Sequence, residues 1–143
     1  MYFGDLAGQA FRVDINNAPK LTGTPTASDL KNNFVKRVVT LFSEQVSSGL
    51  SPRFYEMPSV SIHVDPVTGK SFAAVAYSSG NRSSPLIGTV TANESIITAS
   101  AKDGVFVVYD NDVASKSLYD AGYTPVTVNK SLETLTLANG VAR

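Results

Sequence analysis

The chain has 143 residues, 43% of them hydrophobic, with 12 Lys and Arg balancing 12 Asp and Glu and with no cysteine. This length supports one hydrophobic core and excludes an enzyme of several domains, because domains typically contain roughly 100–150 residues. The charge balance argues against nucleic acid as a partner, the lack of cysteine excludes disulfides and thiolate metal sites, and no apolar stretch approaches the roughly 18 residues of a membrane span.

Short apolar runs rich in β-branched and aromatic residues, separated by turn-forming residues about every ten positions, predict an all-β fold. Residues 2–15 predict an antiparallel hairpin with a glycine-rich turn at residues 4–8. Its second strand alternates between an apolar and a polar face, which are Phe11, Val13 and Ile15 against Arg12 and Asp14. We expect the apolar face of this hairpin to be buried.

Residues 16–33 contain many turn formers and little periodicity, which predicts a long loop insertion. The next segment, residues 29–44, combines a helix-like spacing of apolar residues with several β-branched ones. We favour a loop that enters a strand near residues 35–42.

The clearest hairpin lies in the middle of the chain. Residues 58–64 and 72–78 are expected to pair antiparallel around a turn at residues 65–71. The alternation of the first strand assigns Val60, Ile62 and Val64 to the core and His63 to the opposite face.

Further strands are predicted at about residues 95–100 and 104–109. Residues 112–121 predict a short helix of one or two turns, with Asp112 or Asn111 as the N-cap and Gly122 beyond its C-terminus.

Three segments resemble the C-terminal β-propeller of the PilY/PilC family, large exported proteins associated with the tip and assembly of bacterial type IV pili. Residues 2–14, YFGDLAGQAFRVD, resemble the blade strand pair "aGDlqGnlwRfDl", with Phe11 where the family usually has tryptophan. Residues 77–86, YSSGNRSSPL, are similar to "GSGnRahPl", and residues 105–110, VFVVYD, resemble "fYvlyD". The order and most spacings agree from residue 2 to about residue 112.

The resemblance implies a partial β-propeller of about two to three blades, with residues 1–143 forming a single β-domain that is a fragment of a larger propeller. It implies a non-enzymatic role in type IV pilus biogenesis or adhesion, with pilin, minor pilins or a surface receptor as partners, and an exported location at the cell surface, the pilus tip or the periplasm. We expect partners to bind loops 16–33, 79–90 and 110–125, because binding residues concentrate on loops held by a rigid scaffold.

An incomplete propeller would also leave strand edges uncovered. We therefore expect self-association through the edge near residues 2–15 or the other end near residues 126–138.

The sequence offers few candidates for catalysis. The single histidine, His63, lies two residues from Asp65, so a Ser-His-Asp relay would have to use it. No Gly-x-Ser-x-Gly motif is present, and we expect a surface or inter-sheet histidine and no catalytic residue.

Calcium is the one cofactor that the sequence suggests. Asp110 and Asp112 are weak candidate ligands, with Asn111 between them and Asp120 nearby. The alternative is an Asx turn at the end of a strand or a helix cap. Structural ion pairs are expected between Arg12 and Asp14, and between Arg82 and a carboxylate.

Two alternatives stay open. Quinoprotein dehydrogenases are also propellers, but this chain lacks the tryptophan and adjacent cysteines that would stack a quinone. The other alternative is a self-contained small β-domain that binds partners and whose likeness to the pilus family is accidental.

Overall fold

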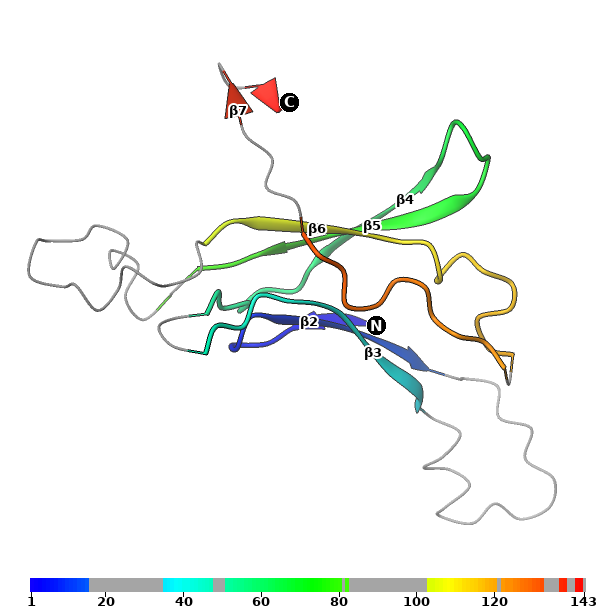
Figure 1. Ribbon diagram of the computed structural model, residues 1–143, viewed down its shortest axis with the longest axis horizontal. Coiled ribbons are helices and arrows are strands. Elements are labelled where there is room, and N and C mark those ends of the chain that lie inside the picture. The colour runs from blue at the N-terminus through cyan, green and yellow to red at the C-terminus, as the bar shows by residue number, and fades with distance from the viewer. Residues whose placement is uncertain are drawn as a thin grey trace, which may run out of the picture.

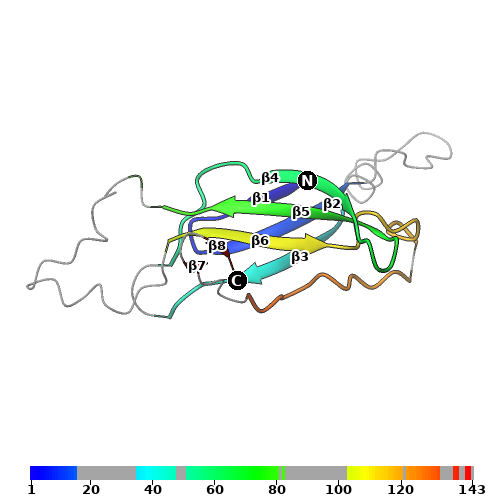
Figure 2. The same cartoon turned by 90° about the horizontal axis from the view of Figure 1, so that it is seen from above.

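The computed structural model describes residues 1–15, 35–47, 51–80, 82, 103–120, 122–132, 137–138 and 141–142. All regular secondary structure in these ranges is β-strand, which confirms the predicted all-β class. Figure 1 shows two three-stranded antiparallel sheets stacked as layers, and Figure 2 shows them from above. No helix that could cross a membrane occurs in the described ranges.

The first sheet has the strand order β1-β2-β3, and the second has the order β4-β5-β6. A separate two-stranded sheet pairs β7 with β8. The strands are β1 (Tyr2–Gly4), β2 (Gln9–Ile15), β3 (Val35–Ser43), β4 (Ser59–Val64), β5 (Ser71–Ser78), β6 (Val105–Asp110), β7 (Leu137–Ala138) and β8 (Val141–Ala142).

The β1–β2 hairpin forms as predicted, and Asp5 organises its turn. The Asp5 carboxylate accepts hydrogen bonds from the backbone N–H groups of Ala7 at 2.9 Å and Gln9 at 2.8 Å, as in an Asx turn. Gly8 adopts a φ of 86°, a left-handed conformation that costs glycine little. The sequence therefore encodes this turn locally.

The face that β2 buries differs from the prediction. Of the predicted apolar face Val13 is buried, but Phe11 and Ile15 are only partly buried. Arg12 and Asp14, assigned to the opposite face, are buried in the interface between the sheets. Arg12 and Asp14 can be buried because their opposite charges neutralise each other in an ion pair, which the alternation of apolar and polar residues does not indicate.

The predicted strand near residues 35–42 is confirmed as β3, and the strand predicted at residues 104–109 is confirmed as β6. The short helix predicted at residues 112–121 is wrong. Residues 112–120 instead form successive turns with backbone hydrogen bonds such as Ser115 N–H to Asp112 C=O at 2.9 Å. The Asp112 carboxylate binds the distant backbone N–H groups of Val126 and Thr127 instead of capping a helix.

The predicted loop at residues 16–33 and the predicted strand at residues 95–100 lie outside the described residues.

The β4–β5 hairpin has the predicted pairing and turn, and His63 is exposed as expected. The prediction that its apolar residues lie in the core is wrong, because Val60, Ile62 and Val64 are 49%, 67% and 61% exposed. The register places Val60 opposite Val75 and Ile62 opposite Ala73, so the three side chains do share the face of the sheet that contains the buried residues of β5.

Coverage by the first sheet explains the difference. The turn end of the β4–β5 hairpin rises away from the first sheet, so little of that sheet lies against β4 (Figure 1). The sequence period specifies which face a side chain occupies, but it does not specify whether another layer covers that face.

The core lies between the two three-stranded sheets. An aromatic group at its centre combines Phe42 of β3, Tyr77 of β5, Phe106 of β6 and Phe54 of the loop before β4, with neighbouring ring centroids 5.4 to 5.9 Å apart. Edge-to-face contacts such as Phe42 on Tyr77 favour a single arrangement of the two sheets. The other buried members of the core are Ala10, Val39, Leu41, Ala73, Val75 and Val108.

Two glycines test how tightly Phe54 is packed. A Cβ added to Gly4 would lie 2.5 Å from the Cβ of Phe54, whereas a Cβ on Gly104 would meet no atom within 4 Å. We expect Gly4→Ala to lower the free energy of unfolding by about 1–3 kcal/mol through overpacking, and Gly104→Ala to leave it nearly unchanged. Urea unfolding of both variants measures this difference, and equal midpoints would contradict the packing described for Phe54.

Candidate functional site

A buried guanidinium joins the two three-stranded sheets. Arg12 of β2 is only 1% exposed. Its Nε donates a hydrogen bond to Asp14 Oδ1 at 2.8 Å, which confirms the predicted pair. Its Nη1 donates to both carboxylate oxygens of Asp110 at 2.8 and 2.7 Å. Because Asp110 ends β6, these ion pairs cross from the first sheet to the second.

Asp112 completes this buried ion cluster, which we define as Arg12, Asp14, Asp110 and Asp112. Its Oδ2 lies 3.1 Å from Arg12 Nη1, and its Oδ1 accepts a hydrogen bond from the Tyr123 hydroxyl at 2.6 Å. Arg37 lies at the margin of the cluster, with Nε 3.6 Å from Asp14 Oδ2. Three carboxylates therefore face two guanidiniums.

The carboxylates proposed as calcium ligands are already occupied. Asp110 Oδ1 accepts the N–H groups of Asp112 and Val113 at 2.8 and 3.3 Å, which is the Asx turn considered as the alternative. Asp112 accepts the N–H groups of Val126 and Thr127, both at 2.9 Å. Within the described ranges no group of three or more acidic or histidine side chains is arranged to hold a metal. A calcium site here stays a prediction.

The cluster shifts the pKa values of neighbouring groups. Burial by itself would raise the pKa of Asp112, but hydrogen bonds from Tyr123, Val126 and Thr127, together with Arg12, lower it to about 2. Burial raises the pKa of the Tyr2 hydroxyl, and Asp110, which accepts its hydrogen bond at 2.9 Å, raises it further. Burial and the charge of Asp110 also raise the pKa of the Tyr77 hydroxyl.

His63 has a serine neighbour but no carboxylate partner in the described part of the chain. Its Nε2 lies 2.8 Å from Ser61 Oγ, and its ring stacks on Phe72. The Asp65 carboxylate instead accepts hydrogen bonds from the Val67 N–H and the Thr68 hydroxyl. The pair of Ser61 and His63 lies on an exposed strand, without the third group that would orient the imidazole in a relay.

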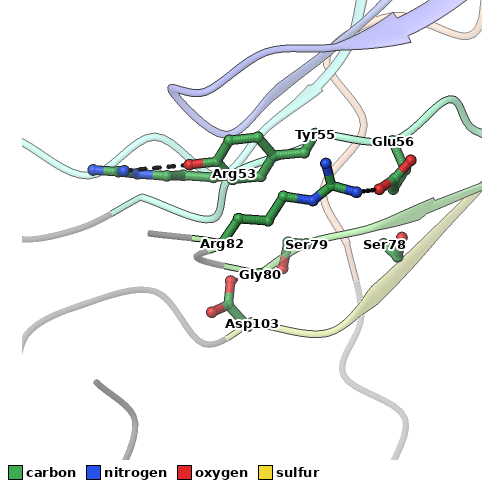
Figure 3. Close-up of a pocket in the computed structure, with 8 residues that line it drawn as sticks. All are labelled: Arg53, Tyr55, Glu56, Ser78, Ser79, Gly80, Arg82 and Asp103. Carbon is green, nitrogen blue, oxygen red and sulfur yellow. Dashed lines mark hydrogen bonds and ion pairs between the residues drawn. The ribbon is translucent and has the colours of Figure 1, made fainter. Parts of the chain in front are cut away.

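A surface cavity of about 410 Å³ opens where β5 ends and β6 begins, and we call it the β5-end pocket. Figure 3 shows its lining side chains, with Arg82 extending past the Tyr55 ring toward Glu56. The lining residues are Arg53, Tyr55, Glu56, Ser78, Ser79, Gly80, Arg82 and Asp103. Three of the lining residues, Ser79, Gly80 and Arg82, belong to the loop 79–90 that the sequence favours for binding.

Each charged side chain of the pocket has a different local partner. Arg82 forms an ion pair with Glu56, which confirms that it pairs with a carboxylate, and its guanidinium lies 5.7 Å from the centroid of the Tyr55 ring. Asp103 accepts a hydrogen bond from the Ser79 hydroxyl at 2.9 Å. Arg53 Nη1 lies 3.5 Å from the Tyr55 hydroxyl, and no carboxylate within the described residues pairs with it.

Sequence reasoning missed the part of this pocket that precedes β4. The only sequence feature that could have indicated this part of the pocket is a run of charged and aromatic residues before the clearest hairpin. The run contains Arg53, Tyr55 and Glu56. The loop 110–125, also favoured for binding, contains the buried Asp110, Asp112 and Leu118 together with exposed residues such as Tyr119, and its role in binding stays a prediction. The loop 16–33 lies outside the described residues.

Comparison with protein-family models, with curated proteins and with solved structures finds no match to this chain.

The ion cluster predicts a large difference between two arginines. We expect Arg12→Met to lower the free energy of unfolding by about 3–5 kcal/mol, because it leaves buried carboxylates without their cation. The matched control Arg82→Met removes an exposed ion pair with Glu56 and should cost at most about 1 kcal/mol. Chemical denaturation of both variants measures the difference, and similar losses would show that the cluster is not buried as described.

The lowered pKa of Asp112 predicts acid sensitivity. The pKa falls from 3.8 to about 2 on folding, so the native state binds fewer protons than the unfolded chain below about pH 5. The stability that this group contributes, about 2 kcal/mol, is present above pH 5 and is lost as the pH falls toward 2. Urea unfolding at several pH values measures this loss, and Asp112→Asn should show a shallower dependence on pH. An identical dependence in the variant would contradict the shift.

Proposed function

We propose that the chain is a non-enzymatic, propeller-like segment of a type IV pilus tip or assembly protein, and that it binds a protein partner through the β5-end pocket. The proposal rests first on the resemblance of residues 2–14, 77–86 and 105–110 to the PilY/PilC propeller. In the fold these segments supply the β1–β2 hairpin, part of the pocket wall and β6. An exported location at the cell surface or pilus tip belongs to the same proposal.

The propeller part of the proposal is supported by the outer face of the second sheet. This face of β6 presents Val105, Val107 and Tyr109, all exposed. Large apolar faces are uncommon on monomeric proteins and usually mark a surface that something covers. A neighbouring blade would cover such a face, as the first sheet covers the inner face of the same strands.

The charge distribution of the β5-end pocket is the observation that carries the binding function. Arg53 presents a guanidinium without a carboxylate partner among the described residues, and the ion pair of Arg82 is exposed and can exchange. A guanidinium donates paired hydrogen bonds that match a carboxylate, and the Tyr55 ring adds an apolar surface beside it. The pocket therefore suits an acidic side chain or a terminal carboxylate of a pilin or minor pilin.

The absence of turnover is part of the proposal. The one histidine lies on an exposed strand, and Asp65 is engaged by its own turn. Neither group is among the residues that line the pocket. A binding role needs only the positioned charges and the ring, whereas hydrolysis would need an activated nucleophile and an oriented base.

The proposal predicts that binding to pili depends on the pocket arginines. We expect the chain to bind immobilised type IV pili or purified minor pilins, and Arg53→Ala and Arg82→Ala each to weaken binding about tenfold, the loss of roughly 1.4 kcal/mol. Lys70→Ala is the matched control, because it removes an exposed cation from the turn of the β4–β5 hairpin.

Biolayer interferometry at two salt concentrations measures these affinities. Absence of binding by the unchanged chain would overturn the pilus assignment. Equal affinity of the pocket variants and the Lys70 variant would overturn the role of the pocket.

A further inference from the structure

The outer edge of β4 is longer than that of β1, with 6 residues against 3, and unlike the edge strands β3 and β6 it carries no charged residue. β4 is the first strand in the order β4-β5-β6, and no described strand pairs with its other side. The segment from Ser59 to Val64 contains no charged residue, and its register with β5 has no bulge, whereas β2 and β3 pair with two irregularities. Charges, bulges and internal prolines are the usual protections of an exposed edge, and this strand has none of them.

The free backbone groups of β4 can be assigned from the turn that follows it. Asp65 N–H donates to Lys70 C=O at 2.9 Å, so Asp65 faces the β5 side of the hairpin. Backbone groups of successive residues in an antiparallel strand point to opposite sides. The N–H and C=O groups of Val60, Ile62 and Val64 therefore point away from β5, toward the open edge.

The prolines that flank the strand limit how another strand can pair with it. Pro58 and Pro66 have no N–H to donate, so a hydrogen-bonded ladder ends at both. The segment between them is centred on Ile62. Antiparallel pairing of two copies about that residue places Val60 opposite Val64, Ile62 opposite itself and Ser61 opposite His63. Apolar side chains then meet apolar ones, polar meet polar, and the two prolines face each other beyond the ladder.

We propose that β4 is a homodimerisation strand, which pairs antiparallel with β4 of a second copy about a twofold axis at Ile62. The pairing joins the second sheets of two copies into one continuous sheet and covers part of the exposed apolar row of Val60, Ile62 and Val64. The uncharged strand brings no like charges together. A single strand pair buries less than the about 800 Å² per partner of a standard interface, so the association is weak and depends on concentration.

Cysteine cross-linking tests the register directly, because the chain has no cysteine of its own. In Ile62→Cys the two sulfurs face each other across a hydrogen-bonded pair, where the Cα atoms are about 5.5 Å apart and a disulfide can form. The matched control Val64→Cys has similar exposure on the same strand and face, but in the proposed register it faces Val60 of the other copy.

We expect mild oxidation to convert Ile62→Cys to a covalent dimer at least about tenfold faster than Val64→Cys, because pairing raises the effective concentration of the facing thiols. Mixing Val60→Cys with Val64→Cys should give the mixed dimer in preference to either self-pair. Equal rates for the Ile62 and Val64 variants would overturn the proposed register.

Sedimentation of the unchanged chain tests the association without a cross-link. We expect the mean mass to rise toward the dimer with concentration, and Ile62→Lys to abolish this rise by placing two positive charges opposite each other. A monomer at every concentration, or a dimer that survives Ile62→Lys, would overturn the proposal. Neither result depends on binding to pili, so this inference and the proposed function can fail separately.

Discussion

The ion pairs of Arg12 are the constraint on which the arrangement of the two main sheets depends. A guanidinium without solvent is stable only when its N–H groups meet carboxylates, and here the partners come from β2 and from the end of β6. The aromatic contacts between the sheets favour one arrangement, and these ion pairs reinforce it because they require Asp110 and Asp112 to lie beside Arg12. We infer that the cluster contributes mainly to the uniqueness of the fold, because replacing a buried ion pair by apolar residues often leaves the net stability unchanged.

The cluster and the aromatic group divide the interface between the sheets. Apolar contact between the sheets comes from the rings of Phe42, Phe54 and Phe106. The carboxylates of the cluster form hydrogen bonds with Arg12, which depend on the orientation of the two groups. Tyr2 links the two regions, because its ring packs against the core while its hydroxyl donates to Asp110. The same carboxylates hold the turns that follow Asp110, so the cluster also fixes the start of the loop 110–125, whose role in binding stays a prediction.

The surfaces left for recognition lie elsewhere. The β5-end pocket combines charged groups that are only partly paired, while β4 offers an apolar, uncharged edge with free backbone groups. Binding of a carboxylate at the β5-end pocket should weaken as the ionic strength rises, because salt screens the charges. Pairing of two β4 strands is weak, so the fraction of dimer depends on the protein concentration. The β4 edge is open because β4 is the first strand of its sheet, and it belongs to the hairpin whose turn end rises away from the first sheet (Figure 1).

The sequence by itself determined the local features of this protein. Alternation and turn residues specified the β1–β2 and β4–β5 hairpins, because pairing between neighbouring segments depends on a period of two and on turn chemistry. For β3 the β-branched residues favoured a strand although the apolar spacing resembled a helix. Asp14 two residues after Arg12 also identified that pair. Only the tertiary structure decided that Asp110 and Asp112 face Arg12, that Arg53 reaches the end of β5, and that Val60, Ile62 and Val64 remain uncovered. These outcomes depend on how two sheets are placed against each other, and a one-dimensional pattern specifies the face of a side chain but not the layer that lies opposite it.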